Sequence, residues 1–170
     1  MKHFMKSYEN FISSNKFLSY RQELLNASLL EYSTKKASLL KMKTLIEDGA
    51  DVNFEKYSKT PLINATLQMF YSGVKLLIEK GADVNKATDK KETPLLVLFS
   101  LPNYTFSKYD NVKKITHLLI ENGADISTKN LNGEDIFNLK PNMETEIEFY
   151  FPKQYEEYLL KKTANKYNIG

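Results

Sequence analysis

The chain has 170 residues, of which 42% are hydrophobic, a net charge of +3 and no cysteine. Its length and apolar content are those of one folded domain, and the lack of cysteine excludes disulfides, thiolate metal sites and a cysteine nucleophile. Because the charge is small and no apolar run reaches the length of a signal sequence or a membrane span, we expect a cytoplasmic monomer that binds neither nucleic acid nor membranes, with delivery into a host cell as an alternative.

The first 21 residues are expected to form a helix at the N-terminal end of the domain. Apolar side chains recur there with the i, i+4, i+7, i+8 spacing of an amphipathic helix. Such a helix can cover the end of the fold, or its apolar side can dock into a partner. We take the capping role as the first interpretation and keep docking as the alternative. The apolar residues are Phe4, Tyr8, Phe11 and Ile12.

A five-residue string recurs along the chain. Gly-Ala-Asp-Val-Asn stands at 49–53 and again at 81–85, and Gly-Ala-Asp-Ile-Ser follows at 123–127. Each copy comes just after a Leu-Ile pair at the same distance, which is typical of the buried stripe of a helix. Glycine just past a helix end adopts a left-handed conformation at little cost. One helical unit is therefore repeated, with Leu45, Ile46, Leu77, Ile78, Leu119 and Ile120 in the core.

Thr-Pro-Leu is a second marker, and it begins the first helix of two units, at Thr60 and Thr93. The threonine hydroxyl can cap the helix, and proline fits its first position. From this marker to the glycine is 21 residues in one unit and 30 in the next, so the third unit has nine extra residues between its helices. In the first unit, residues 24–29 match residues 62–67, and about six extra residues are expected around Glu31 to Lys36.

Thr-Pro-Leu at a helix start, a helix-turn-helix, a Leu-Ile pair, Gly-Ala-Asp-Val-Asn and a period near 33 together resemble the ankyrin repeat. The resemblance implies an all-α fold, an ankyrin-repeat solenoid of about three full helix-turn-helix repeats plus a partial fourth, with helical caps. The implied boundaries are a cap at 1–21, repeats over 22–140 (about 22–53, 54–85, 86–127 and 128–140 onward) and a cap at 141–170.

The chain departs from the family pattern at two kinds of position. The family's histidine at the helix start is replaced by Ile63 and Leu96, which removes its usual polar links. The family's glycine two residues before the threonine is Ser58 or Lys91 here, and only Gly133 fits. A left-handed residue other than glycine costs on the order of 1 kcal/mol. We therefore expect the turns at these two residues to be remodelled.

The repeat pattern is lost at Lys140 and Pro141, and residues 142–165 are expected to close the stack. A helical stripe of apolar side chains competes there with a strand-like alternation of acidic ones. Terminal repeats need a cover with a polar outer face, so we expect helix, with Pro152 opening a further helix. The stripe is Met143, Ile147, Tyr150 and Phe151, and the alternating residues are Glu144, Glu146 and Glu148.

No residue set predicts catalysis, a metal site or a cofactor. His117 aligns with Lys43 and Lys75 in the second helix, which places it on the solvent side, and His3 lies in the terminal segment. The acidic triplet lacks the glycine turn of a calcium loop. The repeated aspartates at 51, 83 and 125 are expected to bond amides in their own turns. We expect no enzyme activity, because phosphate-binding and nucleophile motifs are also absent.

The resemblance implies a concave face, lined by hairpin tips and first helices, that binds a protein partner. The long loop at 101–110 adds aromatic side chains that either face the partner or fold back onto the scaffold. The predicted contact residues are Phe54, Lys56, Tyr57, Lys59, Lys86, Asp89, Lys90, Glu92, Lys129 and Asn130 in the tips, Gln68 and Met69 at the end of a first helix, and Tyr104, Phe106 and Tyr109 in the loop.

Two functional classes fit these features. In the first, the protein binds a partner and inhibits or redirects it, since small ankyrin proteins of microbes and viruses include host-directed effectors and toxin-neutralising immunity proteins. In the second, it is a regulatory or scaffolding subunit of a larger assembly. Complete caps at both ends favour the first class, whereas an exposed apolar terminal face favours the second.

Overall fold

The computed structural model describes residues 5–6, 9–10, 12, 14–35, 38–102 and 110–167. These residues are mostly helical, and a short antiparallel contact between Lys56 and Lys59 is the one bridge among them. The helices are α2 (Asn15–Tyr32), α3 (Leu39–Glu47), α4 (Pro61–Leu67), α5 (Tyr71–Glu79), α6 (Pro94–Ser100), α7 (Asp110–Glu121), α8 (Ile136–Leu139), the 3-10 helix η1 (Pro141–Met143), α9 (Glu144–Tyr150) and α10 (Pro152–Tyr167).

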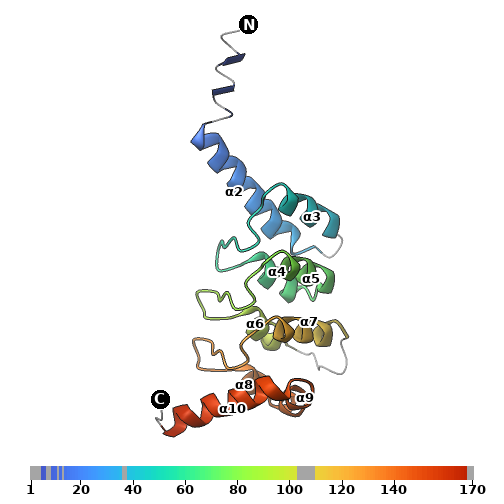
Figure 1. The fold of residues 1–170 in the computed structure, drawn as a ribbon, viewed down its shortest axis with the longest axis vertical. Coiled ribbons are helices and arrows are strands. Elements are labelled where there is room, and N and C mark those ends of the chain that lie inside the picture. The colour runs from blue at the N-terminus through green and yellow to red at the C-terminus, as the bar shows by residue number, and fades with distance from the viewer. Residues whose placement is uncertain are drawn as a thin grey trace.

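The helices form pairs that stack in series, as Figure 1 shows. The first helix of each pair contacts its neighbours, α4 lying against α2 and α6, while α5 lies against α3 and α7. The short helix α8 follows on from α6, and α9 and α10 close the far end. The predicted all-α repeat solenoid is therefore confirmed.

Polar caps begin the first helices as the sequence predicted. Thr60 Oγ1 accepts a hydrogen bond from the Ile63 amide at 3.2 Å, and Thr93 Oγ1 accepts one from the Leu96 amide at 3.3 Å. A proline occupies the first helical position in both, where a missing N–H is harmless. The partial fourth unit uses Asp135 instead, whose carboxylate accepts from two amides of α8.

The second helices supply most of the predicted core. Leucine and isoleucine of the repeated pair point into one continuous apolar cluster that extends from α2 to α10. Because each pair recurs at the same register, the cluster has no break between units. Leu45, Leu77, Leu119 and Ile120 are buried, and Ile46 and Ile78 are half-buried and packed against the same cluster.

Left-handed residues mark the ends of the second helices and the hairpin turns. Gly81 has a φ of 87°, and the glycines at 49, 123 and 133 are also left-handed. Lys91 keeps the same conformation with a φ of 58°, so the expected remodelling of its turn is wrong. At Ser58, whose φ is also 58°, the preceding Tyr57 is left-handed too. That hairpin therefore has the two-residue form, which matches its shorter loop.

The first unit begins in helix α2, which starts at Asn15, inside the segment predicted as the N-terminal cap. Helix α2 runs through residue 21 and on to Tyr32. Part of the extra loop that was predicted around residues 31–36 is therefore the last turn of this helix. Its N-terminal half projects beyond the stack (Figure 1), and Leu18 and Tyr20 are exposed. Of the predicted amphipathic stripe, Ile12 is 36% exposed and the three aromatic residues lie outside the described residues.

The C-terminal end is helical, as predicted, and Pro152 begins α10. Met143, Ile147 and Phe151 of the apolar stripe are buried. The predicted acidic face is only partly solvated, because Glu144 and Glu146 are half-buried and the Tyr155 hydroxyl donates to Glu144 at 2.8 Å. Burial, followed by this bond to a carboxylate, raises the pKa of Tyr155 to about 12.

His117 is not on the solvent side, and that prediction is wrong. Its side chain is 26% exposed, and its ring lies 5.0 Å from the Tyr150 ring and 4.7 Å from the Phe151 ring. Burial lowers its pKa below the ordinary value of 6.5. The reason is the position of His117 in the stack. The capping helices pack against α7, whereas nothing comparable in the described part of the chain covers Lys43 and Lys75, which are exposed in the equivalent helices of earlier units.

Candidate protein-interaction surface

The hairpin turns between units lie side by side along one side of the stack (Figure 1). They comprise residues 54–59, 86–92 and 129–134, which we call the tip surface. Each turn leaves a helix that ends in glycine and enters the next through a Thr or Asp cap. Because helix pairs stack in register, the three turns form one row.

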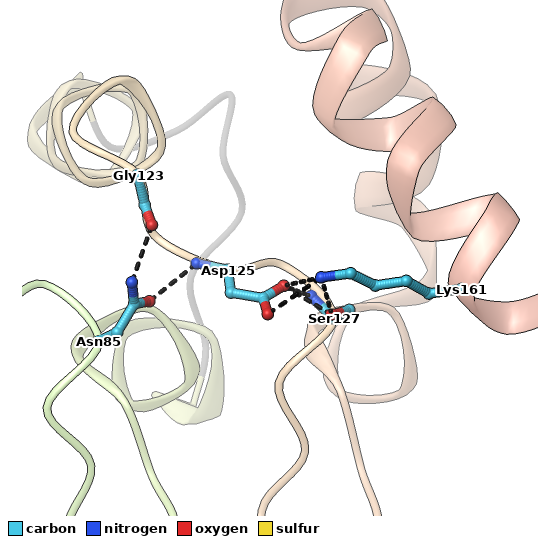
Figure 2. Close-up of polar contacts among 5 residues, drawn as sticks. All are labelled: Asn85, Gly123, Asp125, Ser127 and Lys161. Carbon is cyan, nitrogen blue, oxygen red and sulfur yellow. Dashed lines mark hydrogen bonds and ion pairs between the residues drawn. The ribbon is translucent and has the colours of Figure 1, made fainter. Parts of the chain in front are cut away.

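A ladder of side-chain amides fixes the spacing of these turns. Asn53 donates to the Gly81 carbonyl at 3.0 Å and accepts from the Asp83 amide at 2.8 Å. Asn85 does the same one unit later, at 2.8 Å to Gly123 and 2.9 Å from Asp125 (Figure 2). Each bond joins backbone groups of neighbouring units, so the asparagine ladder holds the turns at a constant interval.

The first step of the ladder is built differently. Gln22 donates to the Gly49 carbonyl at 2.8 Å, and Asn26 accepts from the Asp51 amide at 2.7 Å. Two residues of α2 therefore take the role of one asparagine. In the part of the chain that the structure describes, no hairpin turn comes before this unit to supply that asparagine. The aspartates accept amide bonds in their own turns at 2.8 to 2.9 Å, as predicted.

The ladder ends at Ser127, where the next asparagine would stand. Lys161 of α10 reaches this place and lies 3.2 Å from Asp125 Oδ2 and 3.2 Å from Ser127 Oγ (Figure 2). Burial acts to raise the pKa of Asp125, but the bonds from Ser127 and Lys161 outweigh it and the pKa is lowered. The ammonium group of the capping helix thus takes the place of a further repeat.

Adjacent turns are also bonded to one another at their outer ends. Lys86 donates to the Asn53 carbonyl at 2.8 Å and lies 3.6 Å from Glu55. The Leu131 amide donates to the Lys90 carbonyl at 3.2 Å. The tip surface is therefore ordered before any partner binds, which lowers the entropy cost of binding.

The predicted tip residues divide by exposure. Lys56 pairs with Glu23 at 3.8 Å, Lys86 is committed to the neighbouring turn, and Asn130 accepts the amides of Asn132 and Glu134 at 3.0 Å. Those residues shape the turns. Tyr57, Lys59, Asp89, Lys90 and Lys129 are exposed, and Phe54, Lys56, Lys86, Glu92 and Asn130 are half-buried.

The other predicted contact residues do not lie on the tip surface. Gln68 and Met69 follow the end of α4, and the tips precede its start, so about 10 Å of helix separates them. Met69 is half-buried against the core. Tyr104, Phe106 and Tyr109, in the connection from α6 to α7, lie outside the described residues. Gln68 and Met69 are therefore separate from the tip surface.

One exposed tip residue was missed from the sequence. Leu131, in the third turn, is 63% exposed. It stands 42 positions after Asp89, the interval between the glycines of those two units, so comparing the turns in register would have found it. Together with Tyr57, which is 86% exposed, it gives the tip surface two apolar projections.

In the described part of the chain, no group of three or more histidine and acidic side chains could hold a metal ion. None of the helices described is both long and apolar enough to cross a bilayer. The predictions that the chain lacks enzyme activity and cofactors stay predictions.

Comparison with known proteins agrees with the repeat architecture, although no family model matches the chain. Protein R664 of Acanthamoeba polyphaga mimivirus, whose name describes it as an ankyrin repeat protein, is 33% identical over 96 residues, 51% of this chain. The ankyrin repeat and KH domain-containing protein mask-1 of Caenorhabditis elegans is 34% identical over 100 residues, 59% of this chain. The chain is an ankyrin-repeat protein.

The ankyrin-repeat chain spans 59% of the length of the viral relative and 4% of the length of mask-1. Ankyrin repeats generally serve as non-catalytic protein-interaction modules, and stacked repeats offer extended surfaces for this purpose. The tip surface is the part of this ankyrin-repeat protein that best fits such a use.

Proposed function

We propose that this ankyrin-repeat protein binds a partner protein across the tip surface and thereby inhibits or redirects it, as an effector or an immunity-type protein does. The observation that carries the proposal is Tyr57, which is 86% exposed and left-handed with a φ of 53°. A bulky residue in that conformation is strained, and strain of this kind clusters at functional sites. An exposed tyrosine brings a large contact area at a low entropy cost.

The surroundings of Tyr57 indicate the character of the partner. Lys59, Lys90 and Lys129 are exposed along the row of turns, and Leu131 provides a second apolar projection. Complementary charge speeds encounter and fixes the register of a complex. The proposed partner surface is therefore acidic, with an apolar depression that receives Tyr57. The proposed place of action is the cytoplasm of the producing cell or of a host.

Affinity capture followed by mass spectrometry tests this proposal. The test variant is Tyr57→Asn with Leu131→Asn, because asparagine tolerates the left-handed conformation and keeps the turn folded. The matched variant changes Tyr104, Phe106 and Tyr109 of the loop between α6 and α7 to alanine. We expect the tip variant to lose the partner that the wild type captures, and the loop variant to retain it. Retention by the tip variant and loss by the loop variant would overturn the proposal.

A role as a subunit of a larger assembly is the second candidate. Leu24 is 58% exposed and Leu40 is 78% exposed on the first pair of helices, where a stack normally ends in a polar face. Light scattering across a concentration series, with Leu24→Gln and Leu40→Gln as the variant, tests this role. Association that the variant abolishes would support a subunit, and a wild-type monomer at all concentrations would speak against self-assembly.

A further inference from the structure

A hollow of about 850 Å³ lies at the C-terminal end of the tip surface. Its walls are the residues around the third turn, helix α8 and the exposed C-terminal half of α10, which runs toward the tips in Figure 1. Phe137 and Tyr158 line it with aromatic rings, and Lys129 and Lys162 line it with ammonium groups. The volume is in the range of sites that hold small ligands or a few side chains.

The carboxylates in this hollow are already engaged by the protein. Asp135 is 5% exposed, caps α8 and accepts from the Tyr158 hydroxyl at 3.3 Å. Glu144 accepts from the Tyr155 hydroxyl. Among the lysines, Lys161 is bonded to Asp125 and Ser127. In the described residues, no salt bridge joins Lys129 or Lys162 to a carboxylate, although Lys162 interacts with the Tyr158 side chain and the charges of Glu144 and Asp135 also act on it. A ligand carboxylate could therefore form a salt bridge with either lysine.

Lys162 lies beside one of the aromatic rings that line the hollow. Its ammonium group lies 5.3 Å from the centre of the Tyr158 ring, a cation–π arrangement. Lys129 belongs to the third turn and Lys162 to α10, so the two cations line the hollow from different elements.

The wall that α10 supplies is held in place by three polar contacts. Lys161 binds Asp125 and Ser127 (Figure 2), Tyr158 binds Asp135, and Tyr155 binds Glu144. The ring of Tyr158 also lies 4.5 Å from the ring of Phe137. The hollow is therefore formed without a ligand, which favours binding of a short segment.

A second hollow on the other side of Lys161 differs in charge. It measures about 410 Å³, and Glu121, Asp125 and Glu157 outnumber its lysines. A negatively charged ligand is repelled there. An acidic group is therefore expected in the larger hollow, where Lys129 and Lys162 form no salt bridge, rather than in the smaller one.

We propose that the larger hollow binds an acidic peptide segment of the partner, with a carboxylate side chain between Lys129 and Lys162 and an adjacent aliphatic side chain against the Phe137 and Tyr158 rings. This inference rests on the proposed function, because the hollow continues the tip surface through Lys129. A polyphosphate such as nucleic acid fits less well. Its closely spaced row of phosphates would have to pass Asp135 and Glu144 as well as the two lysines, whereas a single carboxylate side chain needs to lie only near the lysines.

Fluorescence anisotropy with labelled peptides tests the proposal on the full chain. The probe is Gly-Asp-Leu-Asp-Leu-Glu-Gly, compared with its neutral form Gly-Asn-Leu-Asn-Leu-Gln-Gly and with a ten-residue oligothymidine. The test variant is Lys129→Gln with Lys162→Gln. The matched variant, Lys41→Gln with Lys43→Gln, removes two exposed lysines from α3 at the other end of the stack.

We expect the acidic peptide to bind and the test variant to weaken binding about tenfold, as the loss of two charge-assisted contacts implies, while the matched variant changes it less than about twofold. Amide NMR shifts should fall on residues 127–144 and on α10. Failure of the acidic peptide to bind, equal binding of the neutral peptide, or stronger binding of oligothymidine through the same lysines would each overturn the proposal.

The outcome is separable from that of the proposed function. If the peptide fails to bind but partner capture still depends on Tyr57, the hollow is excluded and the tip surface stands. If the peptide binds as expected but capture is independent of Tyr57, the tip surface is excluded and the hollow stands.

Discussion

His117 shows how one register position acquires different surroundings along a repeat. The equivalent lysines are exposed, but the histidine ring packs against Tyr150 and Phe151 of the capping region. Substitution to alanine would remove these contacts, so its effect on stability should exceed that of a surface substitution, which usually stays within about 0.5 kcal/mol.

The same residue should make stability depend on pH. Burial lowers the pKa of His117 from 6.5, Lys113 acts in the same direction, and Glu121 opposes them. Below about pH 6.5, His117 therefore takes up a proton more readily in the unfolded chain than in the folded chain. The free energy of unfolding decreases as the pH falls from there through the folded pKa. We expect urea unfolding at pH 7.5 and 5.5 to show a larger loss for wild type than for His117→Gln. Equal losses of stability in the two proteins would show that burial does not lower the pKa of His117.

Lys91 carries backbone strain that a substitution can remove. Its φ of 58° costs a lysine about 1 to 2 kcal/mol. Glycine would remove this cost, but the greater entropy of the unfolded chain with glycine would offset part of the stabilisation. We expect Lys91→Gly to raise the free energy of unfolding by about 0.5 to 1 kcal/mol in denaturant melts. Lys90→Gly, one residue earlier and not left-handed, should lower it by a similar amount. The opposite order would contradict this turn geometry.

At the scale of the elements, the asparagine ladder joins neighbouring units. Asn85 makes bonds of 2.8 and 2.9 Å to backbone groups of the third unit. Each such bond contributes about 0.5 to 1.5 kcal/mol, so Asn85→Ala should destabilise the protein by about 1 to 3 kcal/mol in chemical denaturation. Asn111→Ala, at an exposed position of α7, is the control and should have little effect. Equal effects would mean that the ladder does not stabilise the stack.

The local elements were predictable because their causes are local. Thr60 and Thr93 cap the helices that they precede, and Gly81 is left-handed just after the helix that it ends. The contact of Lys161 with Asp125 joins residues 36 positions apart. No spacing rule in the sequence indicates which lysine of α10 reaches that turn, because the answer depends on how the capping helix crosses the stack.

At the scale of the whole molecule, the order of the repeats was predictable, but which of the proposed contact residues lie together was only partly so. The row of turns follows from serial stacking of the units. Gln68 and Met69 lie at the opposite end of α4 from the tips because of the direction in which the helix runs. The residue pattern alone did not show which side of the stack each helix end occupies. The hollow beside Lys129 depends on the length of α10, which extends past the repeat helices toward the tips (Figure 1).

The proposed function requires that the row of hairpin turns be the recognition surface. Hydrogen exchange measured by mass spectrometry on the free protein and on its captured complex tests this requirement. The expected result is slower exchange on binding at residues 54–59, 86–92 and 129–134, with residues 101–110 unchanged. Slower exchange confined to residues 68–69 and 101–110, with the turns unchanged, would contradict it.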